Sequence, residues 1–183
     1  MLNGSGRPFF ALIIGIDTYQ DTHIDNMLGC VADADDIQAF LTRDLHIAQD
    51  RIAILRNEKA TYASIVQEIQ KLAANDSVAF NDPILIYYAG CSRATQDGVA
   101  LVLHDSATTD NSDWSSILVD TELNGLLKQL ANRKGNNIVR WSIMGFFFSP
   151  NITLPRLWSL TQVMLRASVE RAMHMRFRTH MFY

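Results

Sequence analysis

A continuous apolar segment of strand length near the N-terminus constrains the fold more than any other feature. Pro8–Ile16 (PFFALIIGI) contains no polar side chain, and such a run is typical of a strand covered on both faces, as in a parallel sheet. Pro83–Tyr88 (PILIYY) has the same character and is followed by Ala89 and Gly90. Both segments therefore predict interior strands of a sheet that carries helices on its two faces.

The segments between and after these runs alternate between helical and strand patterns. Helical periodicity predicts three helices, at residues 33–41, 61–74 and 120–130. Shorter apolar runs predict further strands at residues 51–55, 98–103 and 137–143. This order predicts a three-layer α/β domain with a mainly parallel sheet. Sites in such sheets form at the carboxyl ends of the strands, which directs attention to Asp17, to Gly90–Arg93 and to the residues after the last strand.

The composition changes at about Ile138. Residues 1–138 hold 18 of the 19 acidic residues, whereas residues 139–183 hold only Glu170, with six arginines, no lysine and five of the seven methionines. We therefore predict one domain over 1–138 and an atypical Arg- and Met-rich tail over 139–183 that is poorly ordered or partly helical. Two cysteines form no disulfide framework, and no apolar run reaches the length of a membrane span, so we expect a cytoplasmic protein outside the membrane.

Four segments, taken together, carry a resemblance to a known family. They are Ala11–Tyr19 (ALIIGIDTY), Leu28–Leu41 (LGCVADADDIQAFL), Ile84–Gly90 (ILIYYAG) and Val119–Ile138 (VDTELNGLLKQLANRKGNNI). In this order and at these spacings they resemble the peptidase domain of the caspase/metacaspase family, in particular that of fungal metacaspases. The resemblance covers about three quarters of the chain. It implies a caspase-like fold and a cysteine-type endopeptidase that cleaves after Arg or Lys.

The resemblance also implies a catalytic His–Cys pair, which this sequence does not supply. In the family a strand-end histidine is the general base for a cysteine at the end of the next core strand. The base is needed because a thiol with its usual pKa of about 8.5 is mostly protonated at pH 7. Cys91 stands where the resemblance places the histidine, and no cysteine follows it. We therefore predict a catalytically inactive relative whose last core strand is replaced or missing.

Two other interpretations of the chain stay open. One is a non-catalytic homologue that binds a peptide, a protein substrate or a caspase-like partner chain, and the other is a truncated or mis-spliced product. The substrate-binding residues that the resemblance implies are Asp33, Cys30 and Ala89. In metacaspases the carboxylate at the Asp33 position helps to line the pocket for a basic side chain, a suitable partner for a buried acid. The alternative is that Asp33 charges the helix N-terminus and Cys30 packs in the core.

The remaining reactive residues carry weaker signals. Cys91 is a candidate replacement nucleophile, with His104 or His23 as its base. We favour a relic of a degenerate site, because a thiol moved onto the position of the base does not recreate the attack geometry. His104 and Asp105 are adjacent in a predicted strand and point to opposite faces, which favours a surface histidine over an acid–base pair.

Charged groups suggest no metal or nucleic-acid partner. The acidic clusters are Asp33, Asp35 and Asp36, and Asp105, Asp110 and Asp113. Calcium is implied by the resemblance only, and a solvated acidic surface is favoured because the spacing matches no EF-hand loop. We assign no metal ligand and no cofactor. The Arg-rich tail follows an acidic body, so we expect neither nucleic acid nor a membrane as partner.

Overall fold

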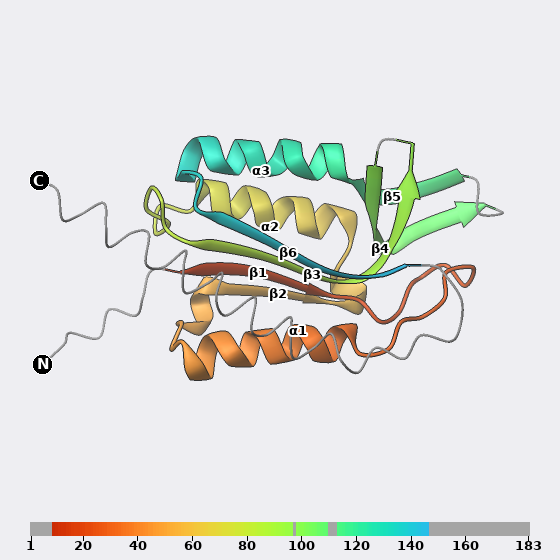
Figure 1. Cartoon of the computed structure of the whole chain (residues 1–183), viewed down its shortest axis with the longest axis horizontal. Helices are drawn as coiled ribbons and strands as arrows, with labels where there is room; N and C mark the ends of the chain where they lie inside the picture. Colours follow the sequence, from red (N-terminus) through yellow and green to blue (C-terminus); the bar gives the residue numbers. More distant parts are fainter. Residues whose placement is uncertain (1–8, 97, 110–112, 147–183) are drawn as a thin grey trace, which may run out of the picture.

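A single sheet lies between two layers of helices in the computed structural model, which describes residues 9–96, 98–109 and 113–146 (Figure 1). Helices α2 (Tyr62–Ala74) and α3 (Asp120–Lys134) cover one face of the sheet, and α1 (Cys30–Ala39) covers the other. The predicted three-layer α/β architecture is thus confirmed. No helix of the described residues is long and apolar enough to cross a bilayer.

Four parallel strands form the main part of the sheet. They are β1 (Phe10–Gly15), β2 (Ile52–Arg56), β3 (Ile84–Thr95) and β6 (Ile138–Phe146). The strand β1 lies between β2 and β3, and β6 pairs with the other edge of β3. Every residue of β1 is buried, which explains why its sequence is apolar throughout rather than alternating.

An antiparallel extension departs from the tip of β3. The strands β4 (Gly98–Thr109) and β5 (Asp113–Val119) are antiparallel, and β4 pairs with the last residues of β3 from Ser92 to Thr95. The register shifts between Val102 and Ala107, and Figure 1 shows the extension beyond the carboxyl ends of the parallel strands. The sequence predicts only the first half of β4 and does not predict β5.

The last core strand, predicted at residues 137–143, is present as β6, so of the two expectations for it, replacement or loss, the strand is not lost. It pairs in parallel with β3 from Ile138, opposite Ile84, to Phe146, opposite Ser92. The predicted domain boundary at residue 138 therefore falls at the start of a core strand, and residues 139–146 belong to the sheet. The rest of the predicted tail, residues 147–183, lies outside the described residues.

The start of α2 and the end of α3 follow from local sequence signals. Thr61 caps α2, because its hydroxyl accepts a hydrogen bond from the Ser64 N–H (3.2 Å). Gly135, with φ +87°, ends α3. The helix α1 continues into a π-helical turn at Phe40–Asp44, and two short 3₁₀ helices lie at Gln49–Arg51 and Asn57–Lys59.

Candidate functional site

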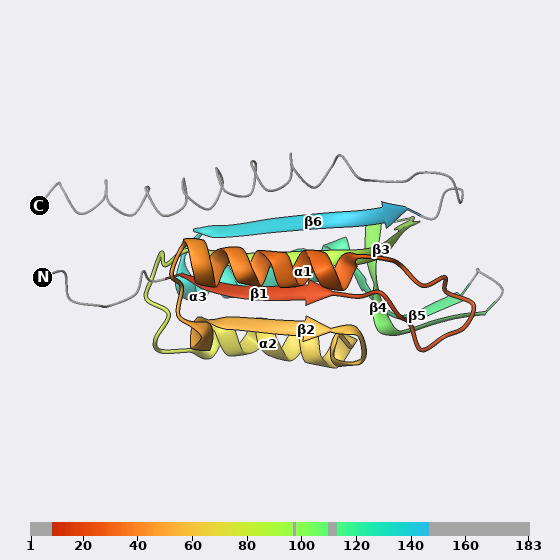
Figure 2. The same cartoon turned by 90° about the horizontal axis from the view of Figure 1, so that it is seen from below.

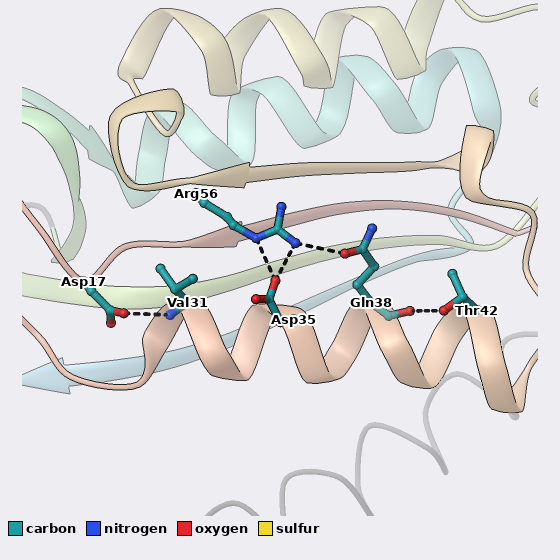
Figure 3. Close-up of polar contacts among 6 residues, drawn as sticks. All are labelled: Asp17, Val31, Asp35, Gln38, Thr42 and Arg56. Atoms are coloured by element: carbon teal, nitrogen blue, oxygen red, sulfur yellow. Dashed lines mark hydrogen bonds and ion pairs between the residues drawn. The ribbon is translucent and has the colours of Figure 1, made fainter.

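The carboxyl ends of β1 and β3 meet the N-terminus of α1, and Asp17 joins them. This residue follows β1, and its carboxylate accepts hydrogen bonds from the N–H groups of Cys30 (2.7 Å) and Val31 (3.4 Å), the second shown in Figure 3. The residue at the helix cap is Gly29, with φ +94° and no side chain to satisfy these donors. Asp17 therefore supplies the cap from a different element and fixes α1 against the strand ends.

Asn57 holds the loop that leaves β1. Its side-chain oxygen accepts hydrogen bonds from the N–H groups of Asp17 (2.8 Å) and Thr18 (3.2 Å). The residue follows β2 and has φ +41°, a conformation that asparagine tolerates better than most residues. The ends of β1 and β2 are thereby tied together beneath the candidate site.

Cys91 is enclosed at the tip of β3 by two tyrosines. Its side chain and backbone are only 1% exposed, and its N–H donates to the Tyr19 hydroxyl (2.8 Å). The Tyr88 hydroxyl donates to the carbonyl oxygen of Cys91 or of Val102, each 2.7 Å away. Burial, with a smaller contribution from Asp25, raises the pKa of the Cys91 thiol to about 12. This environment holds the sulfur as a neutral thiol.

The histidines proposed as bases for Cys91 have other partners. His104 Nδ1 donates to the carbonyl oxygen of Thr18 (2.7 Å), and His23 Nδ1 lies 2.8 Å from Asp21 Oδ1. Among the described residues, the only hydrogen bond of the Cys91 sulfur is its contact of 3.6 Å with the carbonyl oxygen of Ser92. The structure therefore does not bring Cys91 and a histidine together.

The tips of β3 and β6 are adjacent, as the resemblance implies. The register places Cys91 opposite Gly145 and Gly90 opposite Met144. Neither strand tip carries a histidine, and the tip of β6 carries no cysteine. The two strand tips are thus adjacent, with residues other than those that the resemblance implies.

Cys30 and Ala89 lie on the α1 face of the sheet, and Asp33 lies in the first turn of α1. Cys30 and Ala89 are buried in the cluster that joins α1 to β1 and β3, and burial raises the pKa of Cys30 to about 12. Asp33 is partly exposed, and desolvation, followed by the charges of Asp36 and Asp17, raises its pKa. The charge of Asp33 contributes to the raised pKa of Cys30, and the substrate-binding role of the three residues stays a prediction.

Tyr87 of β3 is a further polar residue near Cys30 and Asp33. The sequence does not identify it as a site residue. Its hydroxyl is buried without a hydrogen-bond partner among the described residues. Burial, and then the charges of Asp33 and of its neighbours Cys30 and Asp36, raises the pKa of Tyr87 well above its usual value. The only sequence signal is a tyrosine inside an apolar strand, which does not show the face to which it points.

Two of the other predicted acids, Asp105 and Asp35, have structural partners. Asp105 accepts a hydrogen bond from the Tyr62 N–H (2.9 Å) at the start of α2, so it does not pair with His104. Asp35 Oδ1 accepts from Arg56 Nε (2.7 Å), as Figure 3 shows. No group of His, Cys, Asp or Glu side chains in the described ranges is arranged to hold a metal ion, and Asp110 lies outside those ranges.

The comparisons with known proteins agree with this fold and strand arrangement, which define a caspase-like peptidase domain. The family model of the metacaspase peptidase C14 domain matches residues 10–139. The chain therefore belongs to the metacaspase family. No curated protein matches the sequence.

Solved structures show the same fold at low sequence identity. A protein from Geobacter sulfurreducens is 21% identical, with a TM-score of 0.54 over 75% of this chain and 50% of that chain. Caspase-1 from Spodoptera frugiperda is 14% identical, with a TM-score of 0.54 over 83% of this chain and 54% of that chain. The chain thus spans about half the length of the solved structures that it matches.

Proposed function

We propose that this metacaspase-family domain binds peptides with Arg or Lys side chains and does not cleave them. The observation that carries the proposal is the state of Cys91, a buried thiol whose N–H is held by Tyr19. Two free, buried cysteines also agree with a reducing compartment, so we place the protein in the cytoplasm.

The loss of cleavage follows from the chemistry of sulfur. Peptide attack requires a thiolate, and a thiol with a pKa of about 12 is ionised to roughly one part in 10⁵ at pH 7. A substrate carbonyl cannot approach a sulfur that is enclosed by the strand tip and the two tyrosines. Cys91 is therefore a structural residue in this proposal.

The proposed binding rests on Asp33. Its carboxylate is partly desolvated and lies near Asp36 and Asp17, which raise its pKa. A guanidinium or ammonium group would relieve this repulsion and donate charge-assisted hydrogen bonds. Such hydrogen bonds contribute roughly 1.5–3 kcal/mol, enough for selective recognition of a basic side chain.

The first prediction concerns the purified chain with Arg- and Lys-terminated peptides. Fluorogenic peptides should show no turnover with or without calcium, whereas a labelled, non-cleavable Arg peptide should bind and raise the fluorescence anisotropy. Asp33→Asn should weaken this binding about tenfold, because one charge-assisted hydrogen bond is lost. Asp44→Asn, which removes an exposed charge elsewhere, serves as the matched control and should bind as the unmodified chain does.

Two results would overturn the proposal separately. Turnover that Cys91→Ala abolishes would show that the thiol is a working nucleophile. Equal affinities of the unmodified chain and Asp33→Asn would remove Asp33 from the binding site.

A further inference from the structure

The N-terminal end of α1 carries a carboxylate on the helix and another on the loop that leaves β1. The Asp33 N–H donates to the Gly29 carbonyl oxygen (2.8 Å) and closes the first turn of the helix. Side chains on a helix tilt toward its N-terminus, and at that end Asp17 accepts from the Cys30 N–H (2.7 Å). Figure 2 shows the end of β1 and the start of α1 at the same end of the molecule.

Asp17 is held in this place by hydrogen bonds to its backbone and to its side chain. Its N–H donates to the Asn57 side-chain oxygen (2.8 Å), and its carboxylate also accepts from the Val31 N–H (3.4 Å), as Figure 3 shows for the second contact. Asp17 is partly buried, so water screens its charge less than that of a fully exposed acid. The residue therefore adds a fixed negative charge to the start of α1.

The charge of Asp17 acts on Asp33 across the first turn of the helix. Desolvation raises the pKa of Asp33 most, and the charges of Asp36 and then of Asp17 raise it further. Asp36 is exposed, and the effect of an exposed charge on a ligand is weakened by water and salt. A cation that reaches Asp33 therefore also interacts with the fixed carboxylate of Asp17.

The interaction of Asp17 with such a cation is electrostatic and needs no contact. Its carboxylate already accepts from two backbone N–H groups of α1, and the energy between two charges falls only with the inverse of their distance. A neutral side chain of the same shape gains nothing from this charge. The charge of Asp17 thus distinguishes cationic from neutral side chains.

We propose that Asp17 is a specificity-determining residue of the Asp33 site, where its fixed charge sets the preference for a cationic over a neutral side chain. The proposal rests on the proposed function, the binding of peptides with Arg or Lys side chains. It extends that function by assigning the selectivity to a residue of the loop between β1 and α1. Peptides with Arg and with Lys should gain equally, since both side chains carry one positive charge.

The variant Asp17→Asn separates the charge of the residue from its capping role. Asparagine caps helices as well as aspartate does, so its side-chain oxygen can keep the hydrogen bond with the Cys30 N–H. Labelled, non-cleavable peptides that end in Arg or in citrulline, its neutral analogue, are titrated with each variant. Asp17→Asn should bind the Arg peptide about fivefold more weakly and the citrulline peptide with unchanged affinity. Asp44→Asn, at an exposed acid, should change neither affinity.

A pH titration of the Asp33 carboxyl group by NMR gives a second readout that needs no peptide. The pKa of Asp33 should fall toward its usual value in Asp17→Asn and also in Asp36→Asn, because each variant loses a charge that raises it. Asp44→Asn should leave this pKa unchanged.

The possible contrary results are distinguishable. If the unmodified chain does not bind the Arg peptide, the proposed function is wrong and this inference with it. If Asp33→Asn weakens binding of the Arg peptide and Asp17→Asn does not, only the inference is wrong. Equal weakening of the Arg and citrulline peptides in Asp17→Asn would leave Asp17 a structural role alone, and an unchanged pKa of Asp33 would show that the two carboxylates do not interact. If circular dichroism shows that Asp17→Asn is unfolded, Asp17→Ser, which is neutral and also caps helices, takes its place.

Discussion

At the scale of single residues, the tip of β3 is held by hydroxyl groups that bond to the backbone. Tyr19 accepts from the Cys91 N–H and Tyr88 donates to a carbonyl oxygen of the same tip. Gly90 is required beside them, because a Cβ there would lie 2.5 Å from the Tyr88 hydroxyl. The residues around Cys91 therefore serve to satisfy buried backbone groups, which are costly when left unpaired.

Removal of one of these hydroxyls should destabilise the domain. In Tyr19→Phe the buried Cys91 N–H loses its acceptor, and we expect a loss of about 1–3 kcal/mol in the free energy of unfolding. Urea denaturation measures this loss. Tyr62→Phe, at a partly buried tyrosine whose hydroxyl contacts Glu122 and no buried backbone group, is the control with a smaller expected effect. Equal stability of Tyr19→Phe and the unmodified chain would show that this bond contributes nothing.

At the scale of elements, α1 depends on a residue outside it. The helix begins after Gly29, which offers no capping side chain, and Asp17 accepts from the N–H groups of Cys30 and Val31 instead. The acid also lies at the positive end of the helix dipole, where a negative charge is favourable. Asp17 thereby couples the end of β1 to the start of α1.

Asp17→Ala should weaken this coupling. We expect a loss of about 1 kcal/mol in the free energy of unfolding, as for other lost N-caps, together with faster amide exchange at the start of α1. Asp44→Ala, an exposed aspartate beyond α1, should change neither quantity. An unchanged unfolding midpoint in Asp17→Ala would contradict the capping role.

Two strands show where local sequence patterns do not suffice to predict an element or its length. The strand β5 has an irregular burial pattern, and Ser116 within it has φ +53°, so its sequence lacks a regular alternation. The strand β6, predicted at residues 137–143, pairs with β3 as far as Phe146. Both strands form because they pair with the edge of another strand. That edge comes from a distant part of the chain, so the local sequence of β5 or β6 does not reveal it.

At the scale of the whole molecule, the buried thiols make stability depend on pH. Burial raises the pKa of Cys30 and Cys91 to about 12 in the folded state, from an ordinary value of 9.0. Above about pH 9 the unfolded chain releases these protons while the folded chain retains them. The contribution of each thiol to the free energy of unfolding is therefore fully present below pH 9, and it is lost as the pH rises toward 12.

Stability should accordingly fall in alkaline solution. Between about pH 9 and pH 11 we expect a decrease of up to about 1.4 kcal/mol per pH unit for each thiol, measured from urea midpoints. The double variant Cys30→Ala with Cys91→Ala should show a shallower decrease over the same range. A midpoint that stays constant to pH 11 in the unmodified chain would contradict the burial of the two thiols.

The sequence by itself determined the interior strands, the three main helices and the family. Apolar runs such as Pro8–Ile16 and helical periodicity are local properties, and the order of the elements then restricts the topology. That Cys91 stands where the family has a histidine stays a prediction from the resemblance.

The tertiary structure alone decided the environment of that cysteine. Tyr19 and Cys91 are 72 residues apart, and Asp17 caps a helix that begins at Cys30. Burial, pKa and hydrogen bonding depend on atoms brought together from distant parts of the chain. A pattern within one segment cannot specify these contacts, because they form only when the layers pack.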